Sequence, residues 1–249
     1  MRVIRSLCIA FSTYSRIPVP QVAWTDENRK YSMCFFPLIG AVIGLLLWGW
    51  LALCDALGFG ALLRGAVGIL VTGGIHMDGF MDTSDALASW QSPEKRLEIL
   101  KDSHVGAFAV LGCAGYLLLD AALLSELPTT LAPMMIGCFM LSRAFSAWAM
   151  SAFRSARPKG MLDAFAQAAQ RRMLTISCTV YAVLCAVLWA IVGGWLAIPC
   201  LLAAILCAWY YRHMSYKQFG GITGDLAGWF LQITELTLTA VIVIGGKLL

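Results

Sequence analysis

The sequence predicts an all-α, polytopic membrane protein, a bundle of about seven transmembrane helices with an amphipathic helix at the membrane interface. Three observations support this prediction, and the first is composition: 60% of the 249 residues are apolar and only 13% are charged. A soluble globular domain carries about 25% charged residues, so this chain cannot cover a water-facing surface with ionic groups. The composition excludes a soluble monomer, a disordered chain and a nucleic-acid-binding module. The lipid bilayer is the expected partner.

The second observation is a series of apolar stretches close to the length of about 20 residues that a transmembrane helix needs. We expect seven spans, at 33–56, 62–80, 107–126, 131–153, 173–192, 195–212 and 226–245. The second is the weakest, because Arg64 lies near its start and both His76 and Asp78 lie near its end. No internal repeat or low-complexity linker divides the chain, so residues 1–249 are predicted to form one domain, with a homo-oligomer left open.

The third observation is the alternation of basic residues between these stretches. Lys and Arg occur before the first span and in every second loop, whereas the loops at 57–61, 127–130 and 193–194 carry none. By the positive-inside rule the N-terminus is cytoplasmic and the C-terminus is outside. The predicted location is the cytoplasmic (inner) membrane.

Two of the basic loops are predicted to contain helices of their own. Ser92, Pro93 and Glu94 have the pattern of an N-cap, a proline in the first turn and an early acid. Apolar and charged residues then alternate as far as Lys101, which is typical of an amphipathic helix at the cytoplasmic interface. A second helical stretch is expected around 161–170.

Three acidic residues, Asp78, Asp82 and Asp85, lie within one stretch of eight residues. On a helix, at about 100° per residue, these spacings keep the three carboxylates within an arc of roughly 60°. His76 falls on the opposite side and offers no compensating charge. Because like charges on one stripe repel, we expect a divalent cation between them, and hard oxygen ligands suit Mg²⁺ with waters and phosphate oxygens. A polar helix end leaving the membrane would explain one or two of these residues, but not three at this spacing.

Two further acids, Asp102 and Asp225, each precede a predicted span on the cytoplasmic side. Alone, either could be a helix-start residue that favours the positive end of the helix dipole. With the other three they place five carboxylates at one membrane face, where Gly79 and Gly224 would let backbone N–H groups approach phosphate oxygens. His104, close to Asp102, is a candidate base, although a lone histidine in a loop more often has no such role.

Two charged residues, Arg143 and Glu235, fall at mid-membrane depth. Each lies about ten residues from the cytoplasmic end of its span, which corresponds to roughly 15 Å. Charged groups at that depth are costly and are usually paired or functional. Two interpretations are equally open: an ion pair that ties two helices together, or a role of Arg143 in binding substrate.

The string H-M-D-G-F-M-D-T-S-D, from His76 to Asp85, resembles the H-x-D-G-x-x-D-x-x-D motif of the cobalamin synthases, the adenosylcobinamide-GDP ribazoletransferases. Further segments resemble the family in the same order along the chain: S-R-I-P-V-P from Ser15, F-P-L-I-G from Phe36, L-E-I-L-K-D-S-H-V-G from Leu97, G-G-I-T-G-D-L-A-G from Gly220 and T-E-L from Thr234. The chain departs from the family at His104, where the family often has Arg, and this weakens the assignment of a base there.

The resemblance implies that adenosylcobinamide-GDP is joined to α-ribazole, or to its 5′-phosphate, with release of GMP, in a Mg²⁺-dependent membrane reaction. On this basis four carboxylates are the expected metal ligands, those of Asp78, Asp82, Asp85 and Asp225. Asp82 or Asp85 would accept the proton of the attacking hydroxyl, with Asp102 and His104 as alternatives. Gly79, Arg143 and Gly224 are the expected contacts to the substrate.

Two other functions compete with this interpretation. CDP-alcohol phosphotransferases also use Mg²⁺ on helices that carry Asp. Their D-x-x-D-G-x-x-A-R core is absent here, because Asp78-Gly79 is followed by Phe80-Met81-Asp82. A divalent-cation transporter would place acids at mid-membrane on several helices, whereas these acids cluster at the cytoplasmic end of the predicted spans.

Overall fold

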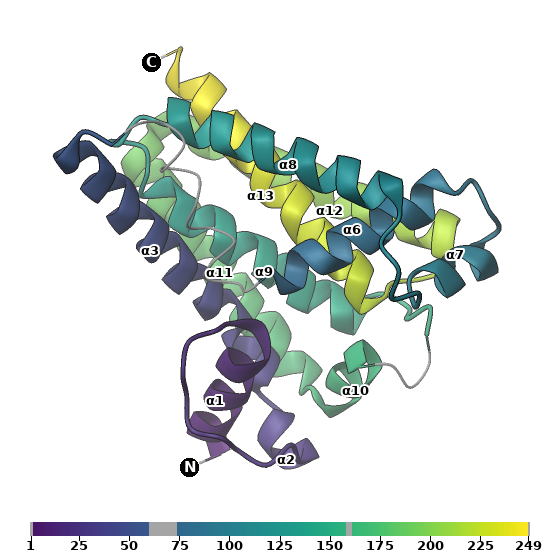
Figure 1. The fold of residues 1–249 in the computed structure, drawn as a ribbon. Helices are drawn as coiled ribbons and strands as arrows, with labels where there is room; N and C mark the ends of the chain where they lie inside the picture. Colours follow the sequence, from purple (N-terminus) through teal and green to yellow (C-terminus); the bar gives the residue numbers. More distant parts are fainter. Residues whose placement is uncertain (1, 60–73, 158–160, 249) are drawn as a thin grey trace.

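The computed structural model describes residues 2–59, 74–157 and 161–248. Regular structure in these ranges is helical (Figure 1), which confirms the predicted fold class. The elements, in chain order, are α1 (Arg2–Tyr14), α2 (Asp26–Arg29), the 3₁₀ turn η1 (Ser32–Phe35), α3 (Phe36–Leu57), α6 (Ile75–Ala88), α7 (Pro93–Ile99), α8 (Ala107–Glu126), α9 (Met134–Ala152), α10 (Met161–Ala168), α11 (Arg171–Gly193), the 3₁₀ turn η2 (Gly194–Leu196), α12 (Ala197–Phe219) and α13 (Gly224–Gly246).

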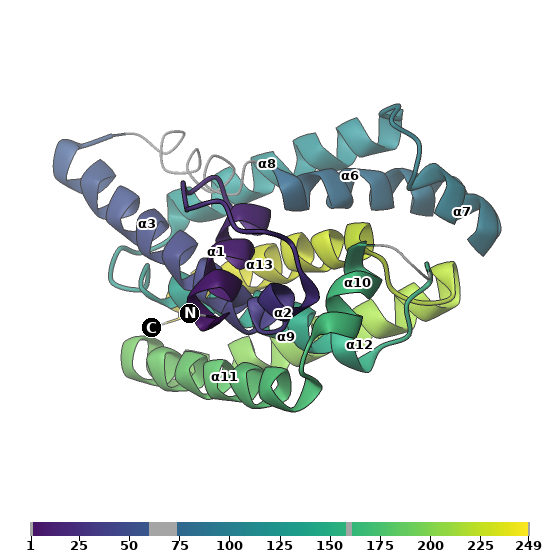
Figure 2. The same cartoon turned by 90° about the horizontal axis from the view of Figure 1, so that it is seen from below.

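Helix α9 forms the centre of the bundle. Fourteen of its 19 residues are buried, and it packs against α3, α11 and α13. Figure 2 shows α9 and α13 between α11 on one side and α6 and α8 on the other. Small side chains allow this packing: a methyl group on Gly40 of α3 would lie 2.1 Å from the carbonyl oxygen of Phe139 in α9. The two backbones are therefore in direct contact.

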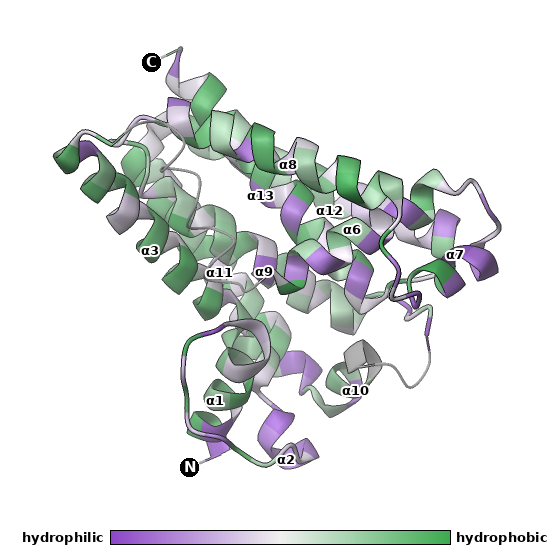
Figure 3. Ribbon diagram, in the orientation of Figure 1, coloured by the Kyte–Doolittle hydropathy of each residue, from purple (hydrophilic) through white to green (hydrophobic). Residues whose placement is uncertain are grey.

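Helix α8 lies at the periphery and is apolar toward the outside. Only Ala109, Tyr116 and Leu124 among its 20 residues are buried, while Leu118 is 73% exposed. An outward-facing leucine is unfavourable in water but favourable in lipid. Figure 3 shows hydrophobic residues covering α3, α8 and α11, and hydrophilic residues gathered on α2, α6 and α7.

Within the described residues, four helical segments are long and apolar enough to cross a membrane: Asp26–Leu57, Ala107–Glu126, Arg171–Phe219 and Gly224–Gly246. The third contains both α11 and α12, each of 23 residues. Helix α9 forms where the fourth span is predicted but is not one of these four. Most of the predicted span 62–80 lies outside the described residues, and α6 covers its end. The count of seven and the orientation of the N-terminus therefore stay predictions.

Both predicted loop helices are present. Helix α7 begins at Pro93, and its N-cap Ser92 accepts a hydrogen bond from the N–H of Lys95 at 3.5 Å. Arg96 of α7 is buried and donates to the side chain of Gln218 in α12, so this helix packs on the protein. Helix α10 occupies the second predicted stretch. Helix α1 was not predicted from the sequence.

Candidate active site at the crossing of α6 and α13

The site forms where α6 crosses the beginning of α13 with no side chain between the backbones. A methyl group on Gly79 would lie 2.7 Å from the carbonyl oxygen of Asp225, and one on Gly228 would lie 3.0 Å from the carbonyl oxygen of His76. Because a Cβ atom at Gly79 would overlap the facing backbone, this crossing requires glycine. It brings Asp78, next to Gly79, to the first turn of α13.

A short backbone pairing brings a basic residue to the same place. Residues 155 and 222 form a parallel bridge, in which the N–H of Ile222 donates to the carbonyl oxygen of Arg154 at 2.9 Å. The chain then places Arg157 beside Asp225, with Nη1 at 3.4 Å from Oδ2. The other amino group, Nη2, donates to the carbonyl oxygen of Leu97 at 2.6 Å. Arg157 is thus held in one orientation by two partners.

The first turn of α13 adds backbone donors. Thr223 is its N-cap, and the hydroxyl of Thr223 accepts a hydrogen bond from the N–H of Leu226 at 3.2 Å. Gly224 is exposed, and no atom would lie within 4 Å of a methyl group added there. The N-terminus of a helix of 23 residues, with its positive dipole end, therefore opens into free space.

These elements enclose a cavity of about 320 Å³, a size within the usual range for small-molecule sites. Two groups of side chains line it. The polar group is Asp78, Ser155, Arg157, Thr223 and Asp225. The second group is mainly apolar and includes three rings: Tyr14 lies 4.5 Å from Phe36 and 6.4 Å from His76, measured between ring centroids.

The polar group carries more negative charge than Arg157 neutralises. Burial and the carboxylates of Asp78, Asp225 and Asp85 raise the pKa of Asp82 to about 6, and Arg157 offsets only part of this. A carboxyl group with such neighbours gains from a nearby cation.

The residues present fit Mg²⁺ bound together with phosphate, and not a cage of protein ligands alone. Within the described ranges no group of three or more His, Cys, Asp or Glu side chains is arranged to hold a metal ion. Mg²⁺ usually takes one or two carboxylates and completes its shell with waters and substrate phosphates. Asp78 and Asp225 both line the cavity and could supply these carboxylates.

Of the three predicted carboxylates of α6, Asp78 lines the cavity, Asp82 does not, and a third environment surrounds Asp85. Its Oδ2 accepts the N–H of Gly106 at 2.6 Å and its Oδ1 accepts the N–H of Ala109 at 2.8 Å. Both oxygens therefore cap the N-terminus of α8, and Asp85 does not line the cavity.

Asp102 and His104 form an exposed pair apart from the cavity lining. The ring Nδ1 of His104 lies 2.6 Å from Oδ1 of Asp102, and the backbone N–H of His104 donates to the same oxygen at 3.0 Å. These contacts lower the pKa of Asp102, the backbone hydrogen bond having the largest effect.

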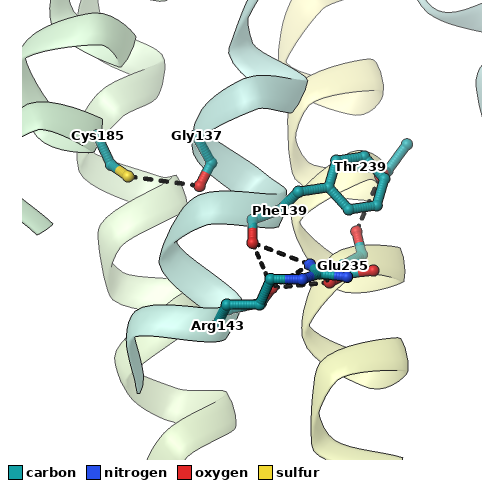
Figure 4. Close-up of polar contacts among 7 residues, drawn as sticks. Gly137, Phe139, Arg143, Cys185, Glu235 and Thr239 are labelled. Carbon is teal, nitrogen blue, oxygen red and sulfur yellow. Dashed lines mark hydrogen bonds and ion pairs between the residues drawn. The ribbon is translucent and has the colours of Figure 1, made fainter. Parts of the chain in front are cut away.

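Arg143 and Glu235 form the ion pair that was one of the two interpretations. Nη1 of Arg143 donates to Oε1 of Glu235 at 2.6 Å and to the carbonyl oxygen of Phe139 at 2.9 Å, and the hydroxyl of Ser142 donates to the same Oε1 at 2.7 Å. Figure 4 shows these groups between α9 and α13. Arg143 is fully buried and does not line the 320 Å³ cavity.

Comparison with known proteins identifies the family. A family model described as Cobalamin-5-phosphate synthase matches residues 6–243. An adenosylcobinamide-GDP ribazoletransferase of Lachnoclostridium phytofermentans is 42% identical over 98% of this chain and 95% of its own. Proteins of the same name from Desulfitobacterium hafniense and Geobacillus kaustophilus are 34% and 35% identical, each over 94% of this chain and over 94% and 93% of their own. No solved structure matches.

The chain belongs to the cobalamin-5-phosphate synthase family. Family membership makes it an enzyme, a membrane transferase of cobalamin biosynthesis, as the motif resemblance predicts.

In this cobalamin-5-phosphate synthase family member, the cavity is also lined by residues that the sequence analysis did not assign to the site. Arg157 lies in one of the basic loops that served only to predict the orientation in the membrane, and Tyr14, Phe36 and His76 were given no role at the site. A signal was present for three of them: Tyr14 directly precedes the S-R-I-P-V-P segment, Phe36 opens the F-P-L-I-G segment, and His76 opens the motif that carries the three aspartates. Their convergence on α6 depends on tertiary packing, which spacing along the chain does not reveal.

Proposed function

We propose that the chain joins adenosylcobinamide-GDP to α-ribazole, or to α-ribazole 5′-phosphate, with release of GMP. The reaction takes place with Mg²⁺ in the cavity at the crossing of α6 and α13, on the cytoplasmic side of the inner membrane. The observation that carries this proposal is the convergence of two carboxylates, Asp78 and Asp225, with Arg157 and a free helix N-terminus on one cavity. The name shared by the relatives supplies the substrates.

The basic and backbone donors of the cavity suit the pyrophosphate of the activated corrinoid. Arg157 lines the cavity, and its Nε has no hydrogen-bond partner in the described chain. A guanidinium group binds phosphate oxygens through paired N–H donors. The first turn of α13, at Gly224, adds the positive end of the helix dipole, which favours phosphate.

Asp78 and Asp225 would hold Mg²⁺, with Asp82 one turn along α6 adding negative charge. When bound, the ion would supply positive charge beside the phosphate groups, where negative charge develops on the leaving GMP. The protein would fix the approach of the ribose hydroxyl in line with the scissile bond. A phosphorus–oxygen bond forms between this hydroxyl oxygen and the corrinoid-side phosphate, and the bond to the phosphate of GMP breaks. One carboxylate of α6 accepts the hydroxyl proton.

The aromatic group of the cavity suits the flat base of the ribazole. Tyr14 and Phe36 offer ring faces, and both ring nitrogens of His76 lack a hydrogen-bond partner. A buried polar group without a partner costs about 1–3 kcal/mol, which a bound base with a free nitrogen would offset. His76→Phe should therefore raise the KM for α-ribazole more than the KM for adenosylcobinamide-GDP. An equal rise in both would place the base elsewhere.

The proposal is tested with purified protein in detergent, adenosylcobinamide-GDP and α-ribazole, by measuring GMP release with Mg²⁺ and with EDTA. We expect metal-dependent release that falls at least about 100-fold in Asp225→Asn, since this loses a charged ligand and keeps the shape. Glu98→Gln is the matched control, because Glu98 is exposed and, within the described part of the chain, its carboxylate pairs with Lys95 alone. Absence of release from folded wild-type protein would refute the proposal. Activity in detergent also separates a transferase from a transporter, since it needs no gradient.

A further inference from the structure

A second, smaller cavity lies in the membrane-spanning part of the bundle, between α8, α9 and α13. Its volume is about 30 Å³. A water molecule needs about 10–15 Å³ by the same measure, so there is room for one or two water-sized species and none for an organic substrate or a phosphate group.

Oxygen-bearing side chains line this small cavity. They are Tyr116 and Asp120 of α8 and Gln232, Glu235 and Thr239 of α13. Gln232 is 7% exposed, and neither its amide nor the carboxylate of Asp120 nor the hydroxyl of Tyr116 has a hydrogen-bond partner in the described part of the chain. Three unpartnered polar groups facing one cavity indicate that something polar completes them.

The charges around the cavity do not balance. Glu235 uses Oε1 to bind Arg143 and Ser142 (Figure 4), so the Arg143–Glu235 pair is neutral. Asp120 adds a second carboxylate, and nearby Leu118 and Leu119 of the same helix are 73% and 57% exposed to the apolar outside. The groups that line or bond to the cavity therefore sum to one negative charge, which is costly inside a membrane.

We propose that this cavity binds one monovalent metal cation of the size of Na⁺. A single positive charge balances Asp120, whereas a divalent ion would leave an excess positive charge beside Arg143. The carboxylate of Asp120, Oε2 of Glu235, the amide oxygen of Gln232 and the hydroxyls of Tyr116 and Thr239 supply oxygen ligands, the type that hard cations prefer. The bound ion links α8 to α13 and is independent of the proposed Mg²⁺ site.

The experiment is thermal unfolding of the purified protein in detergent, without Mg²⁺, in NaCl and in choline chloride at equal ionic strength. We expect Na⁺ to raise Tm by about 3–6 °C when its concentration exceeds its dissociation constant about tenfold. Asp120→Asn removes the charge and keeps the shape, and it should abolish this difference. Glu126→Gln is the control: Glu126 lies on the same helix, is exposed and pairs with Lys247, so this variant should keep the full shift.

Retention of radioactive ²²Na⁺ by the wild-type protein supplies a measurement that does not depend on a variant folding. One ion bound per chain would support the proposal, and no binding would overturn it. The proposal would also be overturned if the Tm of the wild type did not change with Na⁺ but changed with pH, and if Asp120→Asn abolished this pH dependence. That result would assign the balancing charge to a proton. Persistence of the Na⁺ shift in Asp120→Asn would place the ion elsewhere.

Discussion

Asp78 and Asp85 lie on the same stripe of α6, about two turns apart, in opposite environments. Near the start of α6, Asp78 is exposed and has no hydrogen-bond partner in the described chain, so its oxygens are available to a ligand. Near the end of α6, beside the start of α8, both oxygens of Asp85 accept hydrogen bonds from backbone N–H groups at 2.6 and 2.8 Å. The spacing of the motif places both carboxylates on one side of α6, but the neighbouring elements determine which groups each carboxylate contacts. We interpret Asp78 as a ligand-binding residue and Asp85 as a positioning residue.

The largest expected effect separates these two residues by their Mg²⁺ dependence. Asp78→Asn should lower kcat/KM about 100-fold or more, a loss of roughly 3 kcal/mol, and should raise the Mg²⁺ concentration that gives half-maximal GMP release. Asp85→Asn should leave that Mg²⁺ concentration unchanged, because its oxygens face α8. If both variants shift it equally, the distinction between the two residues is wrong.

The next effect concerns the crossing of α6 and α13, beside which the cavity forms. Gly79→Ala introduces a methyl group 2.7 Å from the carbonyl oxygen of Asp225, so α6 and α13 must separate. We expect a loss of about 1–3 kcal/mol in unfolding free energy, typical of overpacking, together with loss of activity. Gly49→Ala is the control, because no atom lies within 4 Å of its added methyl group. It should be neutral or slightly stabilising in thermal unfolding.

A smaller effect tests the role of Asp85 as the cap of α8. Asp85→Ala leaves the N–H groups of Gly106 and Ala109 without their partner and should destabilise the protein by about 0.5–2 kcal/mol, the usual value of a lost helix cap. Asp85→Asn retains one acceptor oxygen and should lose less. Thermal unfolding of both variants measures the difference. Equal stability of Asp85→Ala and wild type would show that the cap contributes nothing.

The fold class and much of the site could be predicted from the sequence, because the signals for them are local along the chain. Apolar length and helical spacing are local properties, so the long helices, α7 with its Ser92 cap and the stripe of Asp78, Asp82 and Asp85 could be predicted. The role of Asp85 could not, because it depends on where the N-terminus of α8 lies. The contribution of Arg157 likewise depends on the pairing of residues 155 and 222, between segments far apart along the chain.

The smallest effect tests the excess negative charge around the cavity through Asp82. Burial, and then the carboxylates of Asp78, Asp225 and Asp85, disfavour its charged form, and its pKa is raised to about 6. A raised pKa means that ionised Asp82 destabilises the folded protein, so Asp82→Asn should raise Tm by roughly 1–3 °C in EDTA. The gain should develop as the pH rises from 3.8, the ordinary pKa of the carboxyl, to about 6 and should be complete above that value, because below both values Asp82 is neutral in the folded and the unfolded protein. Added Mg²⁺ should remove the gain by neutralising the same charge, while activity of the variant falls. A gain of equal size at low and high pH would mean that the substitution improves packing and does not relieve repulsion.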